Sequence, residues 1–71
     1  MIDTVKLNKL LKARQWTDFD LSLAARVPQA TVYRMRKGRT VPRVDNLQRI
    51  CKALDVEISQ ILLPDLDPIH A

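Results

Sequence analysis

Apolar residues recur at spacings of three and four along much of this chain, the period of a helix with one buried face. Leu7, Leu10 and Leu11 form the first such stripe and predict a helix over residues 4–15, with Asp3 or Thr4 as its N-cap. The same spacing over residues 44–54 predicts a second long helix. Its apolar members are Val44, Leu47, Ile50, Cys51 and Leu54.

Two shorter segments between these stripes also favour helices. Phe19, Leu21 and Leu23 alternate, which taken alone suggests a strand, but the alternation covers only about five residues. Thr17 is a good N-cap and can form a capping box with Asp20, so we expect a helix over residues 18–25. Trp16 precedes it, and we expect its ring to close over the core.

The run VPQATVYRMRKG (residues 27–38) predicts the third helix, over about 28–37. Its opening proline suits a helix start, and Gly38 suits the left-handed position after a helix end. Val32 and Met35 lie three apart and can both face inward. The other faces then carry an amide, a methyl group, a phenol and several cations, the groups that contact base edges and phosphates.

Composition limits the fold to one small helical domain. The chain has 71 residues, 46% of them hydrophobic, which argues against disorder, and its single glycine argues against a turn-rich β fold. Ile58, Ile61 and Leu62 indicate a short fifth helix ending before Pro64. We therefore predict an all-α, compact five-helix domain over residues 1–63 and a loosely ordered tail over 64–71.

The residues exclude several other classes of protein. Cys51 is the only cysteine, so no internal disulfide is available, and we expect it in the core. The only histidine, His70, lies on the tail, and no cluster of cysteine and histidine suits a metal, so we expect no catalytic residue, cofactor or metal. No apolar run reaches the roughly 18 residues of a membrane span, and the N-terminus resembles no signal peptide. We expect a cytoplasmic protein.

Charge is separated along the sequence. The chain carries a net charge of +4, and six basic residues but no acidic one lie between Arg26 and Arg43. After Lys52 the charged side chains are all acidic. This separation predicts that one face of the domain attracts a polyanion.

Two longer stretches carry a family resemblance. WTDFDLSLAARVPQATVYRMRKG (residues 16–38) and PRVDNLQRICKALDVEISQILL (42–63) resemble the phage repressor/Cro family, the xenobiotic-response-element type of helix-turn-helix. The resemblance covers residues 4–63 and implies a repressor/Cro-like fold, with the helix at about 28–37 in the major groove. The packing positions it implies are Leu21, Ala25, Val27, Val32 and Met35.

The resemblance also implies a set of contacts to double-stranded DNA. The base-reading positions fall on Gln29, Ala30 and Arg34, with Tyr33 beside them. The phosphate or minor-groove positions fall on Lys37, Arg39, Thr40 and Arg43. Alternatives stay open: Arg34 can hold a phosphate, Gln29 can be a solvated cap residue, and Tyr33 can pack on its own helix.

Several residues depart from the family pattern, among them Ser22 and Pro28 as well as the three that follow. Arg26 replaces the turn glycine, and a left-handed backbone there costs on the order of 1 kcal/mol. Asp18 replaces a glutamine that holds a phosphate, so we expect it to repel one. Arg36 replaces a frequent glutamate and adds positive charge.

These expectations lead to two hypotheses of function. The first is sequence-specific operator binding by a transcriptional repressor of the short Cro-like kind, acting as a weak homodimer that DNA strengthens. Its dimer contact is expected at Ile58, Ile61, Leu62 and Leu63. The rival is an antitoxin-like or adaptor module that binds a protein through Phe19 and Leu23, although those two side chains can also pack on the N-terminal segment or the tail.

Overall fold

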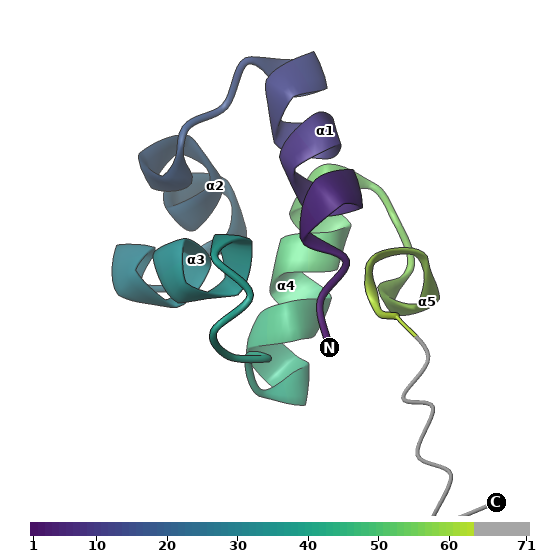
Figure 1. The fold of residues 1–71 in the computed structure, drawn as a ribbon. Helices are drawn as coiled ribbons and strands as arrows, with labels where there is room; N and C mark the ends of the chain where they lie inside the picture. The colour runs from purple at the N-terminus through teal and green to yellow at the C-terminus, as the bar shows by residue number, and fades with distance from the viewer. Residues whose placement is uncertain (64–71) are drawn as a thin grey trace, which may run out of the picture.

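The computed structural model describes residues 1–63, and the predicted tail over 64–71 lies outside the described part. Within residues 1–63, five helices follow one another (Figure 1). They are α1 (Thr4–Arg14), α2 (Asp18–Ala25), α3 (Gln29–Arg36), α4 (Val44–Leu54) and α5 (Ile58–Ile61). Over the described residues there is no strand, only an isolated antiparallel bridge between Ile2 and Leu62. The predicted all-α fold is confirmed.

Helix α4 lies at the centre of the molecule, with α2 and α3 on one side and α5 on the other (Figure 1). Helix α2 packs against both α3 and α4, and α1 packs against α3 and α5. The recognition helix predicted by the sequence, α3, is therefore held by two neighbours, α1 and α2. Its remaining surface is left for solvent or a ligand.

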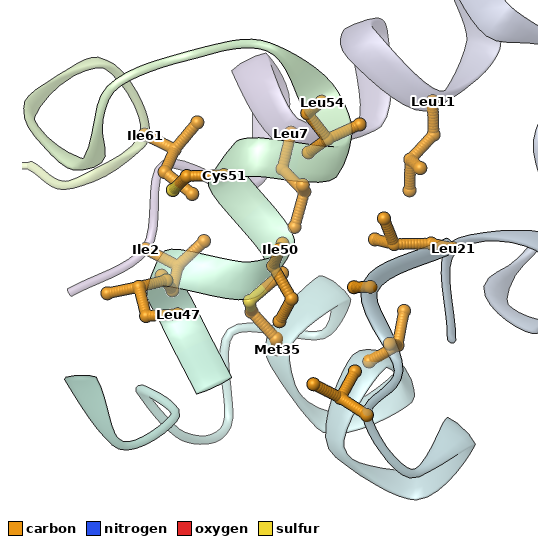
Figure 2. Close-up of a cluster of buried hydrophobic side chains, with 13 residues drawn as sticks. Ile2, Leu7, Leu11, Leu21, Met35, Leu47, Ile50, Cys51, Leu54 and Ile61 are labelled. Carbon is orange, nitrogen blue, oxygen red and sulfur yellow. The ribbon is translucent and has the colours of Figure 1, made fainter. Parts of the chain in front are cut away.

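One hydrophobic core joins all five helices, and Figure 2 shows its side chains converging around α4. Leu7, Leu21, Met35, Ile50 and Ile61 are completely buried. The five inter-helix packing positions implied by the family resemblance are all buried, as predicted. Cys51 is buried too, and this burial raises the pKa of its thiol, so it remains a protonated core residue.

One detail of the apolar pattern needs correction. Val44 was expected on the buried face of its helix, but it is 66% exposed. It is the first residue of α4, where the helix has only just begun, and the buried face starts one turn later at Leu47. Trp16 is half-buried and packs against the core, as expected.

Short-range polar contacts fix where the helices begin. Asp3 caps α1 by accepting a hydrogen bond from the Lys6 backbone N–H at 3.1 Å. The predicted capping box at α2 is present: the Asp20 N–H donates to Thr17 Oγ1 at 3.2 Å, and the Thr17 N–H donates to Asp20 Oδ2 at 2.8 Å. Because both partners are satisfied reciprocally, the start of α2 is well defined.

Glycine supplies the left-handed turn after α3. Gly38 has φ +72°, and a Cβ built there would lie 3.3 Å from Thr4 Cγ2. The Gly38 N–H donates to the Met35 carbonyl and the Arg39 N–H to the Arg34 carbonyl, each at 3.0 Å. This pair of bonds is a Schellman motif, which closes α3 and redirects the basic residues that follow.

Arg26 takes the left-handed conformation that the sequence placed in question, with φ 59° and ψ 46°. We expect Arg26→Gly to raise the free energy of unfolding by roughly 0.5–1 kcal/mol, because glycine removes the cost of Cβ in this region but adds entropy to the unfolded chain. Urea unfolding measures the change. The matched control is Arg49→Gly inside α4, which should instead lower stability by about 1 kcal/mol; a loss at both positions would contradict the strain assigned to Arg26.

The N-terminal segment covers the last helix. The Asp3 N–H donates to the Ile61 carbonyl and the Leu63 N–H to the Met1 carbonyl, both at 2.8 Å. Ile2 is thereby held against α5, and Ile61 is completely buried within a single chain. Ile61 is therefore a core residue, and its assignment to a dimer contact is wrong because the same chain already covers it.

Candidate nucleic-acid interface

The two sides of α3 differ sharply. Val32 and Met35 on its underside have no exposed surface. The outer side carries the predicted base-reading residues, all of which are exposed: Gln29, Ala30, Tyr33 and Arg34. The fold therefore presents on one eight-residue helix an amide, a methyl group, a phenol and a guanidinium. An amide and a guanidinium can each make two hydrogen bonds to one base edge in the major groove.

The start of α3 also has free hydrogen-bonding capacity. Pro28 is its N-cap, and no side chain caps the helix. The backbone N–H groups of a first helical turn carry a partial positive charge. The Thr31 N–H already donates to the Pro28 carbonyl at 3.0 Å, which leaves the N–H groups of Gln29 and Ala30 without an acceptor in the helix. An anionic group approaching this end of α3 would meet those donors.

The predicted phosphate-binding residues lie beyond the other end of α3. Lys37, Arg39, Thr40 and Arg43 are all exposed in the connection to α4. The Lys37 ammonium lies 5.6 Å from the centre of the Tyr33 ring, within the range of a cation–π contact. Tyr33 thus packs on its own helix through Lys37, while the residue as a whole remains 44% exposed. The predicted base-reading residues and the cationic residues therefore follow one another along one segment of chain.

An ion pair that the sequence did not indicate lies beside this surface. The Arg36 guanidinium pairs with the Asp18 carboxylate through Nη1, and its Nε donates to Asn8 Oδ1 at 2.7 Å. The repulsion expected between Asp18 and a phosphate is therefore reduced, and the charge that Arg36 adds is neutralised locally. The only prior signal was that both residues depart from the family pattern, since nothing in their spacing relates them.

Helix α2 leaves two apolar side chains on the surface. Phe19 is 53% exposed and Leu23 62% exposed, while Leu21 between them is completely buried. Within the described residues, neither belongs to the core or to its partly buried margin. Of the two alternatives left open by the sequence, packing on the N-terminal segment is thus wrong; the tail lies outside the described residues.

Residues 1–63 were also compared with the requirements of a metal site and of a membrane-spanning helix. This part of the chain has no group of histidine, cysteine, aspartate and glutamate able to hold a metal ion. None of its helices is long and apolar enough to cross a membrane.

Helices α2 and α3, joined by the short turn at Arg26 and followed by a basic segment, make a helix-turn-helix. A helix-turn-helix followed by a basic segment is the architecture of a class of DNA-binding proteins. The model of the Cro/C1-type HTH DNA-binding domain family matches residues 6–65, and the chain belongs to this family. Comparison with curated proteins and with solved structures gives no match.

Proposed function

We propose that this DNA-binding domain recognises a specific operator and acts as a transcriptional repressor of the short Cro-like kind. The observation that carries the proposal is the exposed face of α3, on which Gln29, Ala30 and Arg34 stand above a completely buried underside. Because that underside fixes the helix on the core, the outer groups form a rigid set that a DNA groove can select.

Selection of bound duplexes from a random pool tests the proposal directly. We expect one enriched sequence, arranged as a near-palindrome whose half-sites are about one turn of DNA apart. Binding measured at several salt concentrations distinguishes operator binding from the protein-interaction alternative. A protein that binds DNA loses affinity steeply as salt rises, because each phosphate it neutralises releases counterions. No enrichment together with a shallow salt dependence would reject operator binding.

The exposed Phe19 and Leu23 favour one alternative, an antitoxin-like or adaptor module that holds a partner protein through α2. DNA binding by the wild type and by Leu23→Ala together distinguishes the two proposals. Under operator binding the substitution leaves the affinity for the enriched duplex unchanged, because Leu23 does not lie on α3. Under the alternative, DNA binding is weak from the start.

The cations after α3 give a prediction about phosphate contacts. Alanine at Arg39 or Arg43 should weaken binding to all duplexes alike and reduce the slope of log affinity against log salt by roughly one unit. Fluorescence anisotropy at four salt concentrations measures this slope. Lys52→Ala is the control, since Lys52 is exposed near the opposite end of α4 from Arg43 and should leave the slope unchanged. Unchanged slopes in the Arg39 and Arg43 variants would remove both residues from the interface.

We further propose that two copies bind together, because one domain this small covers a single half-site. Support comes from the apolar surface around α5, where Leu63 is 42% exposed and Ile58 and Leu62 are half-buried. Two half-sites hold both copies at high effective concentration, so DNA strengthens a pair that is weak when free.

Leu63→Asp tests this contact without removing a buried side chain. Sedimentation of the wild type should show monomers passing to dimers as concentration rises through the micromolar range, while Leu63→Asp stays monomeric because it places a charge in the contact. Circular dichroism should remain that of the folded wild type, since the Leu63 backbone bond to Met1 is kept. Dimerisation of the variant at wild-type concentrations would move the interface elsewhere, first to Phe19 and Leu23.

A further inference from the structure

Arg36 occupies the junction of three helices. It is the last residue of α3, and its guanidinium reaches Asp18, the first residue of α2, and Asn8 in α1. Asn8 is itself held, because its Nδ2 donates to the Thr4 carbonyl at 2.7 Å. The contacts run from the backbone of α1 through Asn8 and Arg36 to Asp18.

The positions of Asp18 and Arg36 at helix ends stabilise the charge of each side chain. The Asp18 carboxylate lies in the first turn of α2 and the Arg36 guanidinium in the last turn of α3, the ends at which the helix dipoles favour each sign. The Asp18 side chain is 19% exposed and the Arg36 side chain 33% exposed, so water screens this pair less than it screens an ion pair on the surface. Among residues 1–63 it is the one salt bridge.

The geometry also separates Arg36 from its neighbours in sequence. Arg34 and Lys37 are exposed, whereas Arg36 is half-buried, and its Nε and Nη1 donate to acceptors inside the protein. Arg36 and Arg34 are two apart on a helix, so they lie on different faces. One arginine faces solvent and the other fixes the helix to its neighbours, although both belong to the same basic run.

We propose that Arg36 is a positioning residue for base reading, which acts through Asp18 and Asn8 and makes no contact with DNA. The inference rests on the proposed function. Helix α3 has only eight residues, so a small rotation about its packed side displaces the groups that must meet a base edge. Base-reading groups tolerate displacements of only about 0.5 Å, and a planar guanidinium bound on two sides restricts such a rotation.

The test compares Arg36→Ala with the wild type on the enriched duplex and on a random duplex of the same length. We expect the ratio of affinity for the enriched duplex to affinity for the random duplex to fall about 3- to 30-fold, the range for losing one of two interacting side chains. The slope of log affinity against log salt should stay unchanged. Arg36→Lys should recover part of the ratio, because an ammonium can pair with Asp18 but cannot hold Asn8 in the same plane. A salt slope reduced by about one unit in Arg36→Ala would make Arg36 a phosphate contact and overturn the proposal.

Asp18→Asn provides a second variant with almost no change in volume, should Arg36→Ala fail to fold. It should lower the affinity ratio in the same direction, and the double variant should lose less than the two single losses combined, because both substitutions break one interaction. If Asp18→Asn instead tightens binding to random DNA and steepens the salt slope, Asp18 merely withholds Arg36 from phosphates and the positioning role is wrong. An unchanged ratio in all variants would also reject it.

Failure of the positioning role is distinguishable from failure of operator binding. If the wild type selects no sequence, the proposed function falls and no enriched duplex exists to compare. If the wild type selects a sequence and these variants retain its full preference, only the inference about Arg36 falls. Circular dichroism at the binding temperature confirms that each variant compared is folded.

Discussion

Arg34→Ala is expected to reduce affinity for the enriched duplex by about 5- to 150-fold, equivalent to the roughly 1–3 kcal/mol that one bidentate contact contributes to base discrimination. Affinity for random DNA should fall far less. The reason is the place of Arg34: it is exposed on α3, on the same segment as Gln29 and Ala30. Competition binding with both duplexes measures the two losses in one experiment.

Arg34→Lys separates base reading from phosphate binding at the same position. Lysine keeps the positive charge but lacks the planar pair of donors that matches a guanine edge. If Arg34 reads a base, the lysine variant should lose most of the preference for the enriched duplex. Retention of both affinities by lysine, with equal losses for alanine on both duplexes, would assign Arg34 to a phosphate instead.

The periodicity of the apolar residues predicted α1 and α4 because each of these helices buries a continuous stripe. Leu7 and Leu11 in α1 and Leu47, Ile50 and Leu54 in α4 are buried as their spacing required. In α3 the two buried positions, Val32 and Met35, also determine which residues face outward. The exposure of the candidate base-reading residues was therefore predictable from sequence, whereas their contacts with DNA remain a prediction.

The N-terminal segment could not be placed in the same way. Ile2 lies outside any helical stripe, and its burial depends on a bridge to Leu62, sixty positions away in the chain. Local spacing contains no information about that pairing. Because the sequence does not show this pairing, nothing in the same chain was expected to cover the Ile61 side chain, and a second copy of the chain was predicted to cover it.

The Asp18–Arg36 pair was missed for a related reason. Each residue was judged alone against the DNA: a carboxylate that repels a phosphate and a guanidinium that attracts one. The fold brings the start of α2 to the end of α3, so the two charges act on each other before they act on a ligand. Net charge along a basic run therefore overstates the number of cations available to DNA.

Leu21→Ala is expected to have the largest effect on stability. Leu21 is completely buried between α2 and the rest of the core, and removing such a side chain costs about 2–5 kcal/mol through lost burial and the cavity left behind. A chain of this size has roughly 4–10 kcal/mol of stability in total, so the variant should be close to unfolding at room temperature. Thermal unfolding by circular dichroism should show a midpoint lowered by about 4–8 °C for each kcal/mol lost.

Leu23→Ala is the matched control, because it makes the same chemical change on the same helix at a side chain that is 62% exposed. It should alter stability by no more than about 0.5 kcal/mol. The contrast tests which face of α2 carries the helix-turn-helix packing, on which the position of α3 depends. Equal losses at the two positions would mean that Leu23 is covered in solution, and its surface would then no longer be available to a protein partner.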